Sequence, residues 1–363
     1  QSGWSLGRVL AYRPDDPQRD LFIHECCFRP ATDVEQAYGR LITDTDRSTA
    51  RLQTLLATAP DVELTAERIS RWLREYDQWT AGPIPREVEI ELTTDDPLAN
   101  TTLRPRGNCV DRRGPIDVAL LARLFDELAS CDDTLVVLGG FGEPLRHPQF
   151  PEIVRLARQH GVYGIAVRTT ALDLNAVIID ALLEAEVDVL SVLLDAHSAD
   201  VYRELHGFDG YDTVVANVES LIRAQEVRQR TQPIIVPEMI KTRRNIGQME
   251  AFYDDWTRRT GAATIVGPPA YDGSFAHLAV MEMTPPRRIP CARLWSRLVV
   301  LADGRVTLCD QDIRGEHAIG RLQEHSLGQL WTGSTMDELR TAHRRGTVDA
   351  IEPCPACKEW HRP

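Results

Sequence analysis

From Val88 onward, short apolar runs alternate with amphipathic stretches at a regular spacing. The apolar runs predict strands at 88–93, 134–138, 163–169, 187–194, 233–239 and 263–266. The amphipathic stretches predict helices at 117–130, 149–160, 175–184, 213–228 and 246–259. Strands and helices that alternate with short loops predict a parallel sheet with helices outside it. A doubly wound sheet and a barrel both satisfy this pattern.

The first 85 residues follow a different pattern, with β-like runs over 4–27 and helices predicted at 33–59 and about 65–79, where Thr65 is the expected N-cap. The run Ala81-Gly82-Pro83-Ile84-Pro85 breaks the chain and marks a boundary. We therefore divide the chain into four parts. These are an N-terminal accessory α+β region (1–85), a βα-repeat domain (86–270), a linker rich in proline and glycine (271–290) and a cysteine-bearing tail (291–363).

Polar and glycine residues gather where the predicted strands end, which is where a barrel places its site. They include 93–96, 139–144, 168–170, Asp195 and Glu238. In the run 139–144, glycines permit positive φ and let a ligand approach the backbone. Backbone groups there can pair with an amino-acid-like ligand, and Glu143 can hold its ammonium group. A tight turn that binds nothing is the alternative.

The tail carries four cysteines in a pattern that predicts a metal centre. Cys291 and Cys309 lie on a predicted strand pair, 290–295 and 303–309, and Cys354 and Cys357 form a C-x-x-C turn. Four thiolates select zinc or an iron–sulfur cluster over hard cations. A zinc ribbon usually has two C-x-x-C knuckles, so the wide first pair favours a cluster. Zinc, a disulfide and a buried C-x-x-C without metal remain alternatives.

Composition narrows the class of protein. The 363 residues are 43% hydrophobic, enough for a sizeable core, and the net charge of −13 argues against nucleic acid as a partner. No run of about 18 apolar residues predicts a membrane span, and we expect no secretory signal. Eight cysteines in this pattern fit a reducing cytoplasm. Adjacent Cys26 and Cys27 are expected in the core.

Taken together, residues 87–363 resemble the radical S-adenosylmethionine (SAM) enzymes with a C-terminal SPASM/twitch domain. The run 139–144 resembles the family's GGE loop, 167–171 its third strand, and 187–196 followed by Tyr202-Arg203 its fourth strand. The resemblance implies a partial (β/α)6 TIM-like barrel. It also implies cofactor contacts from Gly139, Gly140, Gly142, Glu143, Thr169, Ser191 and Asp195. One auxiliary [4Fe–4S] cluster is implied on Cys291, Cys309, Cys354 and Cys357.

One departure from the family pattern bears on chemistry. The C-x-x-x-C-x-x-C loop that follows the first strand in this family aligns here with Asp96, Asn100 and Leu103. None of these is a thiolate, and aspartate and asparagine are hard donors unsuited to an iron–sulfur cluster. Cys109 lies beyond the loop and is expected to be a structural or free thiol. The resemblance therefore implies a degenerate member without reductive SAM cleavage, and makes SAM binding itself doubtful.

Three functions remain open from the sequence. The first is a non-radical protein that binds a small molecule or peptide in the barrel mouth, as a partner of an intact radical SAM enzyme in a modification pathway. The second is an enzyme with other chemistry, either non-radical or radical with another ligand set. Its pocket would draw on polar residues that include Asp95, Asp96, Arg168, Asp195, Glu238 and Lys241. The third is a zinc-tailed α/β binding protein.

Overall fold

The structure is a computed structural model. It describes residues 43, 46–58, 65–75, 84–98, 103, 112–131, 134–271, 276–281, 284–285, 288–349 and 351–361. The β-like runs predicted over 4–27 and the predicted positions of Cys26, Cys27, Asn100 and Cys109 lie outside the described residues.

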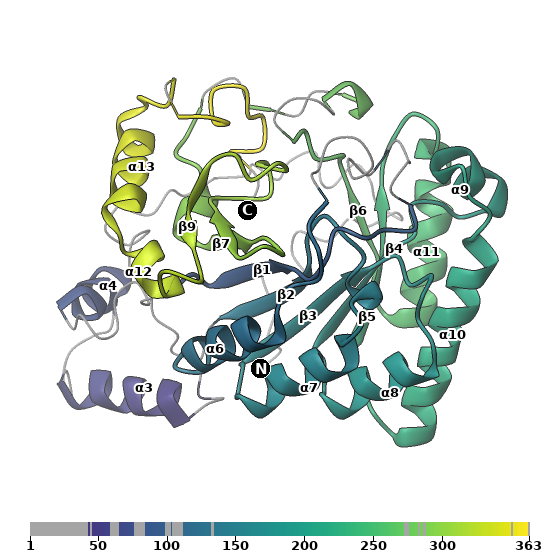
Figure 1. Ribbon diagram of the computed structural model, residues 1–363, viewed down its shortest axis with the longest axis horizontal. Helices are drawn as coiled ribbons and strands as arrows, with labels where there is room; N and C mark the ends of the chain where they lie inside the picture. The colour runs from purple at the N-terminus through teal and green to yellow at the C-terminus, as the bar shows by residue number, and fades with distance from the viewer. Residues whose placement is uncertain are drawn as a thin grey trace.

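A nine-stranded sheet forms the centre of the described chain, in the order β6-β5-β4-β3-β2-β1-β7-β8-β9 (Figure 1). The strands β1 to β6 are parallel, and β7 lies parallel to β1. The strands β8 and β9 complete the sheet as an antiparallel meander. Their bounds are β1 Glu87–Glu91, β2 Leu135–Gly139, β3 Gly164–Thr169, β4 Val189–Leu193, β5 Ile234–Ile240, β6 Thr264–Val266, β7 Arg297–Val300, β8 Arg305–Thr307 and β9 Ala318–Arg321. The predicted parallel, partial TIM-like sheet is confirmed.

Helices cover one face of this sheet (Figure 1). They are α6 Val118–Leu128, α7 Phe150–Gln159, α8 Ala176–Glu184, α10 Tyr211–Arg228 and α11 Met249–Thr260. The described part of the N-terminal region contains α3 Asp46–Thr58 and α4 Ala66–Glu75. The tail adds α12 Leu327–Trp331 and α13 Ser334–Arg345 (Figure 1). The start of α12 contacts α6, because the backbone N–H groups of Leu327 and Gly328 donate to Glu127. Among the described residues, no helix is both long and apolar enough to cross a membrane.

The period-2 pattern of the strands separates an apolar face from a polar one. Val88 and Ile90 of β1 join the core under the helices, so Glu89 lies on the opposite, concave face. In β3, Ile165 and Val167 face the same core, while Arg168 lies on the concave face. Each fully buried aliphatic side chain contributes roughly 1.5–3 kcal/mol. The core therefore fixes the register that brings charged side chains to the concave face.

One expectation for the tail is wrong, and three of the described helices were not predicted. The predicted strand at 290–295 is a short 3-10 helix, η5 Ala292–Trp295, and the strand begins two residues later at Arg297. The helix α9, Ala199–His206, follows β4 where no helix was predicted. The helices α12 and α13 were not predicted either.

The tail strands extend the barrel sheet directly. β7 pairs with β1 from Glu87↔Arg297 to Ile90↔Val300. The buried carboxylate of Glu91 at the end of β1 accepts two bonds from Arg113, at 2.7 and 3.0 Å, and one from the backbone N–H of Ala302, at 3.1 Å. The predicted domain boundaries stay predictions, and the sheet runs without a break from the barrel strands into the tail.

Candidate metal centre and strand-end network

Four cysteines of the tail converge on one cavity, which we call the cysteine cavity. Cys291 is the N-cap of η5, Cys309 follows β8, and Cys354 and Cys357 lie on a turn near the C-terminus. None of the cysteines in the described ranges forms a disulfide. The other lining residues are Arg288, Arg293, Leu294, Leu308, Gln311, His343, Pro353, Glu359 and Trp360. The structure thus brings together the four thiols that the sequence grouped, from segments up to 66 residues apart.

Backbone N–H groups point at three of the four sulfurs. The sulfur of Cys291 accepts hydrogen bonds from the backbone N–H groups of Arg293 and Leu294. The sulfur of Cys309 accepts one from the backbone N–H of Gln311. The N–H of Glu359 lies 3.3 Å from the sulfur of Cys357. Hydrogen bonds of this kind favour the thiolate, which is the form that binds a metal.

These hydrogen bonds lower the pKa of a thiol, but burial raises it by more at all four cysteines. Burial raises the pKa of Cys309 well above its usual value and, with the neighbouring thiols Cys357 and Cys291, raises that of Cys354 to about 12. The thiols are therefore protonated at neutral pH unless a positive centre enters the cavity. Bound metal reverses the balance, because it deprotonates a coordinating thiol outright.

Three side-chain N–H groups around the cavity lack an acceptor. They are Arg288 Nε, Gln311 Nε2 and His343 Nε2, all buried. The other ring nitrogen of His343, Nδ1, accepts from the backbone N–H of Cys291 at 3.5 Å. Burial and the charge of Arg288 lower the pKa of His343 to about 4, so the ring is neutral and Nε2 carries its proton. None of these three nitrogens has an acceptor among the residues that the structure describes.

The donor set fits an iron–sulfur cluster. Within the part of the chain that the structure describes, no three His, Cys, Asp or Glu side chains converge closely enough to hold one metal ion. Four thiols spread around a cavity suit a centre with one iron for each ligand, and the spare N–H groups suit its sulfides. The four cysteines would hold the cluster. Their role as ligands stays a prediction.

A second group of predicted residues lies at the carboxyl ends of β1, β2 and β3, and we call it the strand-end network. Its glycine loop, residues 139–144, lies in close contact with the end of β1 and the residues that follow it. Gly140 has φ +77°, and a Cβ there would lie 2.8 Å from Glu91 Cβ. A Cβ on Gly142 would lie 1.7 Å from the carbonyl oxygen of Thr93. Glycine is therefore required at both positions by the protein's own backbone, whether or not a ligand binds.

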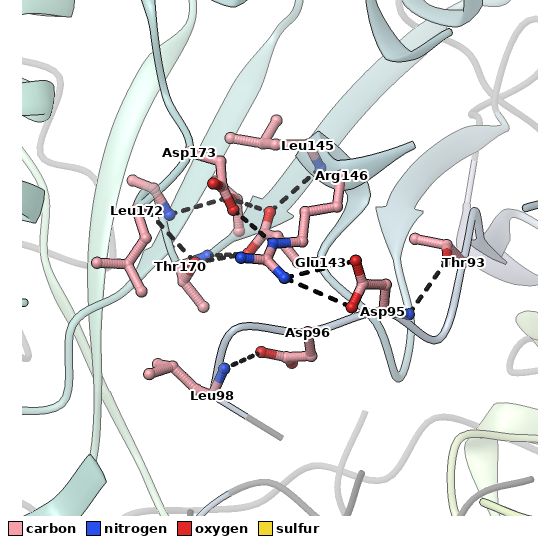
Figure 2. A network of polar contacts seen from close by, with 12 residues as sticks. Thr93, Asp95, Asp96, Leu98, Glu143, Leu145, Arg146, Thr170, Leu172 and Asp173 are labelled. Atoms are coloured by element: carbon pink, nitrogen blue, oxygen red, sulfur yellow. Dashed lines mark hydrogen bonds and ion pairs between the residues drawn. The ribbon is translucent and has the colours of Figure 1, made fainter. Parts of the chain in front are cut away.

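Glu143 is fully buried, and the chain itself satisfies its carboxylate (Figure 2). One oxygen accepts from the Thr169 hydroxyl at 2.6 Å and from the Leu145 N–H at 3.2 Å. The other accepts from the N–H and the hydroxyl of Thr170, both at 2.7 Å. The sequence assigned Glu143 to a ligand's ammonium group. In this geometry its oxygens hold β3 and the glycine loop together instead.

Arg146 spans the loop after β1 and the loop after β3 (Figure 2). It belongs to the short 3-10 helix η2, Pro144–Arg146, and lies 2.9 Å from Asp173 and 3.4 Å from Asp95. Asp96 accepts from the N–H of Leu98 at 2.7 Å, which closes a turn. Leu103 packs in the hydrophobic core, 4% exposed. The two described positions that align with cluster cysteines are thus used for the turn and the core.

Charged side chains also line the concave face. The guanidinium of Arg168 in β3 lies 2.6 Å from the carboxylate of Glu238 in β5. Ser191 of β4 lies opposite Arg168 in the pairing of β3 with β4 and is half-buried. Arg168 remains charged, because Glu238 raises its pKa, and its side chain is 38% exposed. Burial, followed by repulsion from Asp310, raises the pKa of Glu89.

Asp195 and Lys241 have other surroundings. Asp195 is fully buried at φ +62°, accepts from the N–H of Ile240 at 2.8 Å and lies 3.4 Å from His206. It therefore has no exposed surface toward a ligand, and its predicted cofactor contact gains no support from this position. Lys241 is half-buried, and its backbone N–H donates to Val266. Gly139 lies at the end of β2 against Arg168.

Sequence and structure comparisons place the chain among known proteins. A model of the radical SAM superfamily matches residues 109–238, and one of the SPASM iron–sulfur cluster-binding domain matches residues 291–358. An uncharacterized protein of Treponema pallidum (strain Nichols) is 23% identical over 329 residues, which cover 84% of this chain and 87% of that protein. An AdoMet-dependent heme synthase of Methanosarcina barkeri is 28% identical over 141 residues, 39% of this chain and 40% of that protein.

Solved structures share the fold. SuiB of Streptococcus suis bound to S-adenosylmethionine aligns with TM-score 0.59 and 11% identity over 82% of this chain and 79% of that one. BtrN in complex with AdoMet and 2-DOIA aligns with TM-score 0.54 and 15% identity over 76% of this chain and 93% of that one. The superfamily match begins at residue 109, so it does not include the segment 96–103 that we aligned with the family's cysteine loop. The chain belongs to the radical SAM superfamily and carries a C-terminal SPASM iron–sulfur cluster-binding domain.

Proposed function

We propose that this protein holds one auxiliary [4Fe–4S] cluster in the cysteine cavity and does not cleave SAM reductively. The observation that carries the proposal is the structure of the strand-end network. Asp96 is engaged in a turn and Leu103 in the core, where the family has thiolates. Asp95, beside them, is paired with Arg146. Carboxylates and amides are hard donors and do not replace three thiolates around a cluster.

Reductive cleavage in this family needs an iron with an open site that chelates the amine and carboxylate of SAM. The tail cannot supply that iron, because four cysteines would fill its coordination sites and leave none for SAM. The cluster in the cysteine cavity therefore serves electron transfer or structure.

The concave face supports a binding role. SuiB has been solved bound to the precursor peptide SuiA, and anSMEcpe with bound AdoMet and the Cp18Cys peptide. We infer that this chain also takes a peptide or a small molecule at the carboxyl ends of its strands, as a recognition partner of an intact radical SAM enzyme. The partially exposed Arg168 supplies positive charge at that face.

A second candidate is an enzyme that uses non-radical chemistry. Glu89 favours it, because burial raises the pKa of this carboxyl group and makes it a better proton donor near neutral pH. The pair Arg168–Glu238 would orient a charged substrate beside it. Turnover that survives removal of the cluster and falls in Glu89→Gln would favour this candidate over the binding role.

The test of the main proposal is anaerobic incubation of the reduced protein with dithionite and SAM, followed by chromatography for 5′-deoxyadenosine. We expect no product above a control without protein, in either the wild type or the Cys354→Ala variant. Product that depends on the wild-type protein would overturn the proposal. Product that persists in Cys354→Ala would show in addition that a ligand set outside the tail cleaves SAM.

A further inference from the structure

We propose that Gln311, His343 and Arg288 donate hydrogen bonds to the sulfur atoms of the cluster and thereby set its reduction potential. The inference rests on the proposed cluster in the cysteine cavity. It assigns a positioning role to three residues that are not metal ligands. All three line the cavity, and each has a buried side-chain nitrogen with no acceptor.

The missing acceptors point to the cavity itself. Native proteins pair nearly all buried N–H groups, and an exception needs an explanation. Here three exceptions surround one cavity and come from separate segments: Arg288 before η5, Gln311 after Cys309, and His343 in α13. A cluster in the cavity would present sulfide and thiolate sulfurs, which are acceptors, to all three.

Each donor is held in place by a second contact. Gln311 is 2% exposed, and its backbone N–H is already directed at the sulfur of Cys309. The ring of His343 is oriented by the N–H of Cys291, which leaves Nε2–H for the cavity. Arg288 donates through Nη2 to the carbonyl oxygen of Cys354 at 2.8 Å, which places its Nε beside the C-x-x-C turn.

Hydrogen bonds to a cluster act on its redox equilibrium. The reduced cluster carries one more negative charge than the oxidised one, so donors stabilise it more strongly and raise the potential. Removal of a donor should therefore lower the potential and leave the four cysteine ligands intact. A purely structural role for these residues would change stability and leave the potential where it was.

The experiment is an anaerobic redox titration of the full chain, with the reduced cluster followed by electron paramagnetic resonance. In Gln311→Leu and in His343→Phe we expect the ratio of reduced to oxidised cluster at a fixed potential to fall about tenfold. That change equals a shift of about 59 mV for a one-electron couple. The double variant should shift further than either single variant.

The matched control is Gln323→Leu. The Gln323 amide donates to the carbonyl oxygen of Asp303 at 3.0 Å on the exposed side of the same tail, so its removal should leave the potential unchanged. If Gln311→Leu loses its cluster, Gln311→Met, which also lacks the N–H and keeps the length of the side chain, is measured with the same expectation.

The outcomes separate the two proposals. Variants that keep a full cluster at the wild-type potential would overturn the inference and leave the proposed function intact. Wild-type protein that takes up no iron and sulfide would overturn both. A lowered potential in the Gln311 and His343 variants, with the control unchanged, supports the inference.

Discussion

The strand-end network and the cysteine cavity are built in opposite ways. In the network, Glu143 is saturated by Thr169, Thr170 and Leu145, and Arg146 is shared between Asp95 and Asp173. In the cavity, four thiols surround a space and three N–H groups have no acceptor. The first region is complete without a ligand, and the second is incomplete.

Whether buried polar groups are paired within the protein is thus a structural criterion for telling a lost cofactor site from a retained one. A site that has lost its cofactor can close by pairing its own polar groups, because unpaired buried groups are costly. A site that still binds its cofactor is expected to keep buried polar groups that only the cofactor would pair. We propose that the cysteine cavity is such a site, because burial raises the pKa values of its thiols and three N–H groups that line it have no acceptor among the described residues.

The largest effect should come from removing a thiolate. Cys354→Ala should lose most of the bound iron and sulfide, since a cluster held by three remaining thiolates is exposed to oxidation and loss. The loss is measured by the visible absorbance of the cluster in anaerobically prepared protein. Cys131→Ala is the control, because Cys131 is a buried thiol that does not line the cavity. Equal cluster content in both variants would show that the cavity does not hold the cluster.

Glu143 should be the most important residue of the strand-end network for stability. Glu143→Ala leaves the N–H and hydroxyl donors of three residues without their acceptor, so we expect a loss of about 3 kcal/mol or more in the free energy of unfolding. Denaturant unfolding measures it. Glu184→Ala is the control, since Glu184 pairs with Arg155 at the surface and its loss should change stability by less than about 1 kcal/mol.

Loss of stability in Glu143→Ala also affects how a SAM-binding measurement on that variant is interpreted. If Glu143→Ala destabilises the loop and β3, loss of SAM binding in that variant does not identify Glu143 as a ligand contact. A destabilisation no larger than that of Glu184→Ala would mean that the network's hydrogen bonds contribute little, and would restore Glu143 as a candidate ligand contact.

Glu89 should give the protein a pH-dependent stability. Its pKa in the folded state lies above the ordinary value of 4.5, because burial disfavours the charged carboxylate. The folded state therefore binds the proton more tightly than the unfolded state, and stability falls as pH rises from 4.5 through the folded pKa. Each pH unit in that window costs about 1.4 kcal/mol at most. Unfolding measured across pH should show a flatter slope in Glu89→Gln; an unchanged slope would refute this reading.

The smallest effect is expected at Arg146. Its side chain is 34% exposed and that of Asp95 is 53% exposed, so solvent screens the pair. Arg146→Met should change the free energy of unfolding by less than about 1 kcal/mol, and added salt should reduce the difference further. A loss comparable to that of Glu143→Ala would show that the ion pairs, and not the buried hydrogen bonds, keep this region closed.

Local sequence patterns predicted the barrel well, because the strands carry clear apolar runs and the helices clear amphipathic periods. α9 was missed although Ser198 precedes it and Gly207, in a left-handed conformation, ends it. Ser198 is the N-cap and Gly207 the C-cap, and residues of these types at both ends could have located the helix from the sequence. The strand predicted at 290–295 failed because Cys291 caps a 3-10 turn, which apolar content alone does not reveal.

The site was predictable only where spacing carries information. The C-x-x-C turn marked Cys354 and Cys357, and the structure brings Cys291 and Cys309 beside them. The long-range polar contacts could not be predicted. Arg146 lies 51 residues from Asp95 and 27 from Asp173, and His343 lies 52 residues from Cys291. Tertiary packing alone brings these side chains together.

The central claim is that the cysteine cavity holds a cluster and the strand-end network does not. Iron, acid-labile sulfide and zinc, counted per chain in anaerobically reconstituted wild-type protein, test it most directly. One cluster predicts about four irons and four sulfides per chain with little zinc. About eight of each, or zinc in a one-to-one ratio without sulfide, would contradict the account.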